Sequence, residues 1–237
     1  MSITLYCLPC AGASATMYLR WRRRLPPHIE VRPLELPGRG SRLGEPLCTD
    51  AEALVEILRA ELTGRLAAPF ALFGHSMGAL LAFELAHRLT AAGTAPACLI
   101  VAGCPAPTQR DHRVYAELRT DAQLLKKLDE LRGTPPEVFA DLELLRLTLD
   151  ILAADFQICG NYRSASRPPL PAPLHVLGGR DDDIAPGALE AWAGETRAQH
   201  TLTLFDGGHF FIQSHEAAVL EHLQNCLAPY SAAAVAR

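Results

Sequence analysis

The residues best suited to chemistry are a serine, a group of aspartates and a histidine that occur in that order along the chain. Ser76 lies in Gly74-His75-Ser76-Met77-Gly78, which fits G-x-S-x-G, between an apolar run and an Ala/Leu-rich segment. In this pattern a strained strand-to-helix turn lifts the serine hydroxyl above the edge of a sheet, and the flanking glycines avoid clashes with the neighbouring strand and helix. The alternative is an ordinary serine in a strand–helix turn, and the surrounding elements favour the catalytic interpretation.

A serine nucleophile needs a base, and the base needs a carboxylate that fixes its tautomer. Asp181, Asp182 and Asp183 follow an apolar run at 174–179, and His209 follows a second run at 201–205. Each group therefore falls on a loop at the carboxyl end of a strand, where sites in parallel sheets collect. The spacing predicts His209 as the base and leaves the three aspartates open.

The other histidines fit this role less well. His87 and His222 fall within predicted helices and are expected at the surface, while His175 begins a strand. His75 flanks the nucleophile and is expected to point away if Ser76 faces a pocket.

Backbone N–H groups are the expected stabilisers of a developing oxyanion. The first would be the N–H of Met77, directly after the nucleophile, and the second usually lies in the loop after an early strand. Residues 9–15 form a small-residue loop of this kind. A plain turn is the alternative.

Strand and helix patterns alternate along the chain and predict a mostly parallel sheet in one α/β domain spanning residues 1–237. Pro33 indicates that the strand at 29–36 lies at an edge of the sheet or contains a bulge. The expected strands cover residues 3–8, 29–36, a run from Phe70, 98–103, 174–179 and 201–205. Helices are expected at 17–25 and 137–156, and a last helix at 214–226 is followed by a poorly ordered tail from 228.

Residues 111–162 contain helical patterns and no strand candidate. A helical insertion between two core strands, downstream of the nucleophile, predicts a lid over the active site. The alternative is a set of ordinary crossover helices.

Composition limits the function classes. The 237 residues are 49% apolar and carry a net charge of −4, so a nucleic acid is not an expected partner. No apolar run approaches the ~18 residues of a membrane span, and the N-terminus lacks the basic start of a signal peptide. Seven scattered cysteines indicate reduced thiols and a cytoplasmic location, and the Cys7-Leu8-Pro9-Cys10 pair is best explained by packing.

Five segments together resemble the type II thioesterases, stand-alone α/β-hydrolases that accompany nonribosomal peptide and polyketide synthases. The similarity runs from about Leu5 to Leu223. The family's Gly-Gly-x-x-Asp pattern nominates Asp182 as the partner of the histidine. The matching segments are residues 8–14, 35–40, 74–79, 178–182 and 207–211, and Asp155-Phe156 resembles a pair at the end of the family's lid. The chain departs from the family at Ala13, where a second glycine is usual, and at Ala102, where the family often has serine.

The resemblance implies an editing enzyme that cleaves stalled or wrong acyl groups from the phosphopantetheine arms of acyl and peptidyl carrier proteins. Ser76, Asp182 and His209 would form the triad, with the N–H groups of Ala11 and Met77 as the oxyanion hole. No metal or organic cofactor is expected. Two alternatives stay open, a general carboxylesterase or acyl-CoA thioesterase on the same fold, and a non-catalytic carrier-binding protein.

Overall fold

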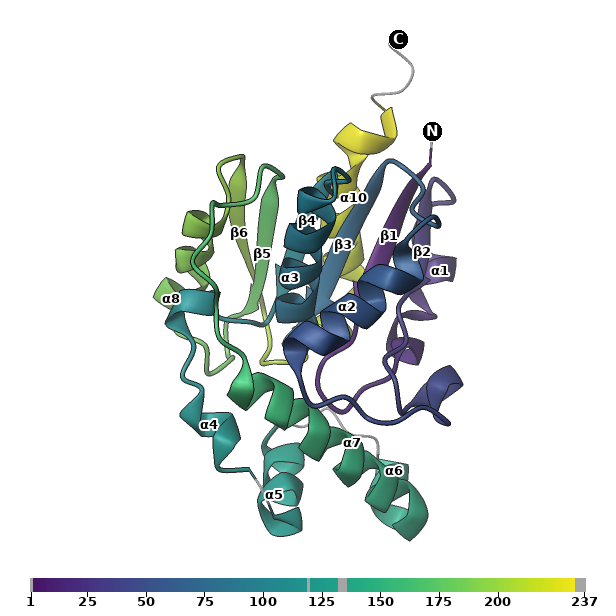
Figure 1. Cartoon of the computed structure of the whole chain (residues 1–237), viewed down its shortest axis with the longest axis vertical. Coiled ribbons are helices and arrows are strands. Elements are labelled where there is room, and N and C mark those ends of the chain that lie inside the picture. The colour runs from purple at the N-terminus through teal and green to yellow at the C-terminus, as the bar shows by residue number, and fades with distance from the viewer. Residues whose placement is uncertain (1, 119, 132–135, 233–237) are drawn as a thin grey trace.

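The computed structural model describes residues 2–118, 120–131 and 136–232, and within them six parallel strands form one sheet (Figure 1). The strand order is β2-β1-β3-β4-β5-β6, which confirms the predicted α/β class and places β2, with Pro33, at an edge. The strands are β1 (Ile3–Leu8), β2 (Ile29–Pro33), β3 (Phe70–His75), β4 (Cys98–Ala102), β5 (Leu174–Gly179) and β6 (His200–Phe205).

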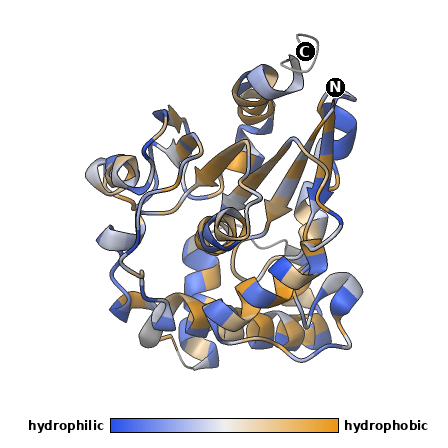
Figure 2. Ribbon diagram, turned by 45° about the horizontal axis from the view of Figure 1, so that its top comes forward, coloured by the Kyte–Doolittle hydropathy of each residue, from blue (hydrophilic) through white to orange (hydrophobic). Residues whose placement is uncertain are grey.

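Helices cover both faces of the sheet, with α2 (Ala51–Leu62) and α3 (Met77–Ala91) in front and α10 (Glu216–Ala232) behind in Figure 1. Alternate side chains of each strand enter two separate cores, as the two-residue period of a strand requires. Leu72 and Val101 pack with α2 and α3, whereas Phe73 and Ile100 pack with α10. The strands are accordingly hydrophobic along most of their length (Figure 2). The remaining helices on this body are α1 (Trp21–Arg24), α8 (Pro186–Glu190) and α9 (Phe211–Ser214).

The strand order reverses between β1 and β3. From β1 the chain moves out to β2 at the edge, and from β3 it moves in the opposite direction through β4 to β6. The loops that leave the carboxyl ends of β1 and β3 therefore diverge, and ligands of open α/β sheets bind in the crevice at such a switch point. The first loop contains Ala11, and the second begins at Ser76.

Among the described residues, four α-helices lie between β4 and β5 in sequence and beyond the carboxyl ends of the strands in space (Figure 1). They are α4 (Arg113–Ala116), α5 (Asp121–Leu131), α6 (Pro136–Ala140) and α7 (Leu142–Asn161). Leu124 and Leu128 of α5 pack against Leu152 and Phe156 of α7 in a third, smaller core. This layer thus has its own apolar contacts. That it acts as a lid stays a prediction.

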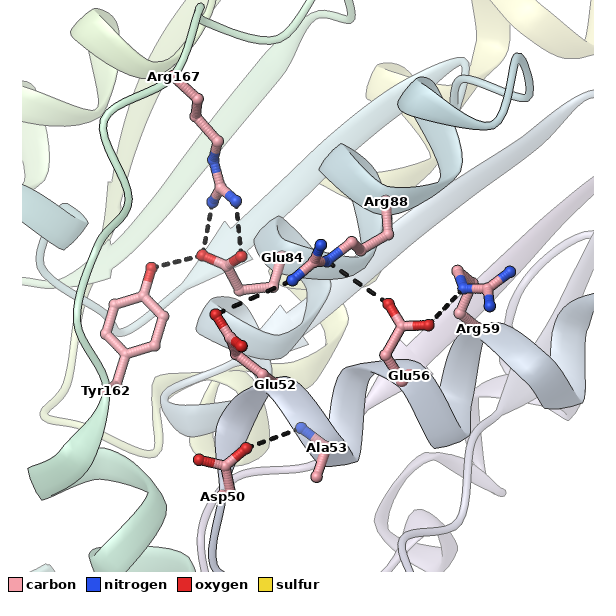
Figure 3. Close-up of polar contacts among 9 residues, drawn as sticks. All are labelled: Asp50, Glu52, Ala53, Glu56, Arg59, Glu84, Arg88, Tyr162 and Arg167. Carbon is pink, nitrogen blue, oxygen red and sulfur yellow. Dashed lines mark hydrogen bonds and ion pairs between the residues drawn. The ribbon is translucent and has the colours of Figure 1, made fainter.

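The C-terminal end of α7 is attached to α3, the helix that follows Ser76, by a small polar network (Figure 3). Tyr162, which follows α7, donates its hydroxyl to Glu84 at 2.7 Å. Arg167 donates to both oxygens of the same carboxylate, at 2.7 and 2.5 Å. The segment that returns the chain to the sheet is therefore tied to α3.

Several element boundaries differ from those that the sequence predicted. The helix expected at 17–25 is a 3-10 turn at Ala15–Tyr18 followed by the short α1. The helix expected at 137–156 is two helices, because the Asp141 side chain accepts from the N–H groups of Glu143 and Leu144 and so begins a new one.

The last helix also differs, since α10 continues to Ala232 where a poorly ordered tail was expected from 228, and the rest of that expected tail, 233–237, lies outside the described residues. Pro229 lies inside it, but the Tyr230 side chain packs against the core behind the sheet and stabilises this last turn. Among the described residues, no helix combines the length and apolar character needed to cross a membrane.

Candidate active site

The turn at Ser76 has the geometry of a nucleophile elbow. Ser76 has φ +55° and ψ −116°, and no other non-glycine residue in the described chain has a positive φ. A Cβ on Gly74 would lie 2.0 Å from the carbonyl oxygen of Gly78, and one on Gly78 would lie 2.2 Å from the carbonyl oxygen of Leu8. The predicted strained turn is present, and both glycines are required by the close approach of strand and helix.

His209 and Asp182 are brought together by the loops after β6 and β5. Nδ1 of His209 lies 2.9 Å from Oδ2 of Asp182. A carboxylate can only accept, so Nδ1 carries the proton and Nε2 is left with a free lone pair that can act as a base. Asp181 and Asp183 are exposed. Of the three aspartates that the spacing left open, the structure brings Asp182 to the histidine.

Ser76 and His209 line the same cavity, which has a volume of about 430 Å³. Tyr115 of α4 and Phe156 of α7 line it as well, so the helical layer forms part of its wall. Within the described residues, no hydrogen bond joins Ser76 to His209. Catalytic hydrogen bonds are often long in a ligand-free site and tighten when substrate binds.

No role for His75 was predicted from the sequence, although this residue contacts the candidate base. His75 is fully buried, and its Nε2 donates to the carbonyl oxygen of His209 at 2.9 Å. The two imidazole rings lie 5.0 Å apart. Burial, and secondarily the nearby His209, lowers the pKa of His75 to about 3, so the ring is neutral. From the sequence we expected only that His75 points away from the pocket. Its hydrogen bond to the His209 backbone was not predicted.

The N–H groups of Ala11 and Met77 are the candidate oxyanion donors. Across the residues that the structure describes, neither group donates a hydrogen bond. Met77 is the first residue of α3, where N–H groups have no partner inside the helix. Ala11 lies in a turn closed by the bond from Ala13 N–H to the Cys10 carbonyl oxygen, at 3.1 Å. Ala11 lines the cavity with Ser76.

The family usually has a second glycine where this chain has Ala13, and this difference leaves the turn intact. Gly12 is the third residue of the turn and has φ +77°, as a type II turn requires. Ala13 is the fourth residue and needs no positive φ. The glycine that the backbone demands is therefore retained.

The loop is attached on one side to α7 through Asp155. The N–H of Gly12 donates to Asp155 Oδ2 at 2.8 Å, and Arg39 donates to both oxygens of the same carboxylate at 2.6 and 2.7 Å. The side chains of Arg39 and Asp155 are 3% and 0% exposed. This is a buried, bidentate ion pair that also holds a loop backbone.

Glu35 attaches the other side of the loop. Its carboxylate accepts from the Ser14 hydroxyl at 2.6 Å and from the Ala15 N–H at 3.0 Å. Glu35 and Arg39 both belong to the segment 35–40. This segment therefore holds the loop after β1 in place through hydrogen bonds and an ion pair. The resemblance contained the motif and Asp155 without indicating that they meet.

Two histidines expected at the surface are half-buried. His87 packs edge-on against Phe83 and His222 against Phe205, with ring centroids 4.6 and 5.8 Å apart. Burial lowers the pKa of His87 to about 4. The surface prediction was therefore right only in part, because each imidazole ring is partly covered by a phenylalanine.

An all-parallel sheet, an elbow serine and a downstream Asp–His pair define the α/β-hydrolase class. A family model described as a thioesterase domain matches residues 3–227. The chain therefore belongs to the thioesterase family, and the protein is a hydrolase of thioesters. The relatives below place it among the type II thioesterases of nonribosomal peptide and polyketide pathways, which confirms the resemblance.

The Gramicidin S biosynthesis protein GrsT of Aneurinibacillus migulanus is 34% identical, over 93% of this chain and 87% of that protein. The structure of the type II thioesterase BorB from the borrelidin biosynthetic cluster is 38% identical, with a TM-score of 0.87 over 95% of this chain and 92% of that one. ClbQ from the colibactin pathway is 31% identical with a TM-score of 0.90, over 97% and 98%.

One relative carries a name that refers to a different reaction. The Linear gramicidin dehydrogenase LgrE of Brevibacillus parabrevis is 37% identical, over 96% of this chain and 89% of that protein. A dinucleotide-binding fold usually has G-x-G-x-x-G directly after its first strand. The corresponding residues 9–14 of this chain are Pro-Cys-Ala-Gly-Ala-Ser, which do not fit that pattern.

Proposed function

We propose that this thioesterase releases stalled or aberrant acyl groups from the phosphopantetheine arms of carrier proteins, through an acyl-enzyme on Ser76. The observation that carries the proposal is the cavity that Ser76 and the Asp182-paired His209 share beneath the α4–α7 layer.

In the first step Ser76 Oγ attacks the thioester carbonyl carbon and His209 Nε2 takes the hydroxyl proton. The N–H groups of Ala11 and Met77 stabilise the oxyanion. The C–S bond then breaks as His209 returns the proton to the pantetheine sulfur. Water, activated by the same nitrogen, attacks the acyl-enzyme, and the free acid leaves with Ser76 regenerated.

Carrier-bound substrates fit the architecture. A phosphopantetheine arm is long and thin enough to enter between the helical layer and the sheet while its carrier stays outside. We propose that residues 111–162 act as a lid and that residues 1–237 work as one domain. The seven free cysteines support a cytoplasmic location, where thiols stay reduced and such carriers act.

The test compares kcat/KM for one short acyl group on a carrier protein, on coenzyme A and as a nitrophenyl ester. Remote docking energy can position the reacting carbonyl, so we expect the carrier form to exceed the coenzyme A form by at least ~10-fold. Equal values for the two thioesters would favour a general acyl-CoA thioesterase or carboxylesterase.

The proposed triad is tested with matched aspartate variants. Ser76→Ala is expected to lower turnover by ~10⁴-fold or more without unfolding the protein. Asp182→Asn should be severe, whereas Asp181→Asn and Asp183→Asn should stay near wild type. Carrier binding with no turnover in the wild type would support the non-catalytic alternative, and a large loss at Asp181 or Asp183 would overturn the assignment of Asp182.

A further inference from the structure

Asp155 of α7 contacts the loop that contains Ala11, although 143 residues separate it from Gly12. The carboxylate accepts three hydrogen bonds, two from Arg39 and one from the Gly12 N–H, and it is fully buried. The hydrogen bond from the Gly12 N–H is not part of the ion pair between Asp155 and Arg39. It fixes the peptide unit that directly follows the candidate oxyanion donor.

A second contact joins the same face of α7 to this loop. Leu152 lies three residues before Asp155, on the same side of the helix. A Cβ on Gly12 would lie 3.1 Å from Leu152 Cδ1, so the helix packs closely against the turn. Arg39 adds a bond to the Ala13 carbonyl oxygen at 3.3 Å. Asp155, Leu152 and Arg39 together enclose the turn at Gly12 and Ala13.

We propose that Asp155 is a positioning residue for the oxyanion hole. By accepting from Gly12 N–H while paired with Arg39, it orients the Cys10–Ala13 turn so that the Ala11 N–H faces the carbonyl oxygen attacked by Ser76. The helical layer is then part of the catalytic machinery and not only a cover. This inference rests on the proposed function of Ser76 and Ala11.

The structure also supplies a matched control on α7. Tyr162 attaches the far end of the same helix through its bond to Glu84 (Figure 3), and within the described residues no hydrogen bond joins it to the loop or to the Arg39–Asp155 pair. Tyr162→Phe therefore weakens an attachment of α7 without removing a contact to the turn.

The experiment measures kcat and KM of an acyl-pantetheine thioester for wild type, Asp155→Asn, the double variant Arg39→Met/Asp155→Leu, and Tyr162→Phe. Urea unfolding establishes that each variant is folded at the assay temperature. The double variant removes both charges together, a change that is often neutral for stability. Removal of one oxyanion donor costs ~10²–10³ in kcat, so misplacing the donor is expected to lower kcat by at least ~10-fold with KM little changed.

Binding of butylboronic acid, which forms a tetrahedral adduct with a reactive serine, supplies a second readout. We expect the double variant to bind it at least ~10-fold more weakly and Tyr162→Phe to bind it like the wild type. A folded double variant with wild-type kcat and boronate affinity would overturn the inference, as would equal losses in Tyr162→Phe. An inactive wild type would instead contradict the proposed function itself.

Discussion

His75 makes the stability of this protein sensitive to acid in a way that can be calculated. Its pKa lies at about 3 in the folded chain, against an ordinary value of 6.5, because the ring is fully buried and lies beside His209. The folded pKa is depressed, so between pH 6.5 and 3 the unfolded chain binds a proton that the folded chain does not. Stability must therefore fall as the pH falls through this window.

One site of this kind changes the free energy of unfolding by about 1.4 kcal/mol per pH unit inside the window. Between pH 7 and pH 5 the expected loss from His75 alone is about 2 kcal/mol. That is a large part of the roughly 5–15 kcal/mol that stabilises a typical domain.

The assay is urea unfolding at pH 7, 6 and 5 for the wild type and for His75→Gln, whose amide can still donate to the His209 carbonyl. The wild type also contains other buried histidines, so the informative quantity is the difference between the two slopes. Between pH 7 and pH 5, we expect the unfolding of His75→Gln to take up about one proton fewer than the unfolding of the wild type, so its free energy of unfolding should fall less steeply with decreasing pH. Parallel slopes for the two proteins would refute the argument that His75 is neutral and buried in the folded state.

Other outcomes follow from close contacts in the same region. Gly78→Ala should abolish activity and destabilise the fold, because the new Cβ would lie 2.2 Å from the Leu8 carbonyl oxygen, and circular dichroism with a thioester assay checks both. Arg39→Met should cost about 3–5 kcal/mol in urea unfolding, since it leaves the Asp155 carboxylate buried and unpaired. Arg110→Met should cost less than about 1 kcal/mol, because Nε and Nη2 of Arg110 are buried without a hydrogen-bond partner among the described residues. A larger loss at Arg110 than at Arg39 would contradict this comparison.

Much of the fold could be predicted from the sequence because its signals are local. Short strand patterns bounded by turn residues marked each strand, as in the continuous apolar run at 98–103, and G-x-S-x-G together with its flanking strand and helix predicted the turn at Ser76. Chain order alone placed His209 after the last strand. Where the prediction failed, a single side chain decided the result, as at Asp141, which begins a new helix, or Tyr230, which holds the last turn of α10.

Contacts between distant segments could not be obtained in this way. The choice among Asp181, Asp182 and Asp183 depends on which loop residue faces His209, and residue type is the same at all three. The burial of His75 depends on the close approach of the loop after β6. A buried histidine next to a nucleophile has no sequence signature of its own, since its partner is a backbone carbonyl.

If the loop after β1 helps to stabilise an oxyanion, as we propose, the presence of the anionic side chain of Asp155 beside it needs a physical explanation. A carboxylate near an oxyanion would ordinarily oppose its formation through like-charge repulsion. Asp155 is paired on both oxygens with Arg39, so the pair adds little net charge to the site. What Asp155 contributes is a fixed acceptor for Gly12 N–H, which orders the turn before any substrate binds. Preorganised donors need no rearrangement when charge develops. Under the proposed mechanism, the order of the oxyanion hole would depend on the contacts that Asp155 and Leu152 of α7 make with the turn at Gly12, and not on the attachment of α7 at its far end.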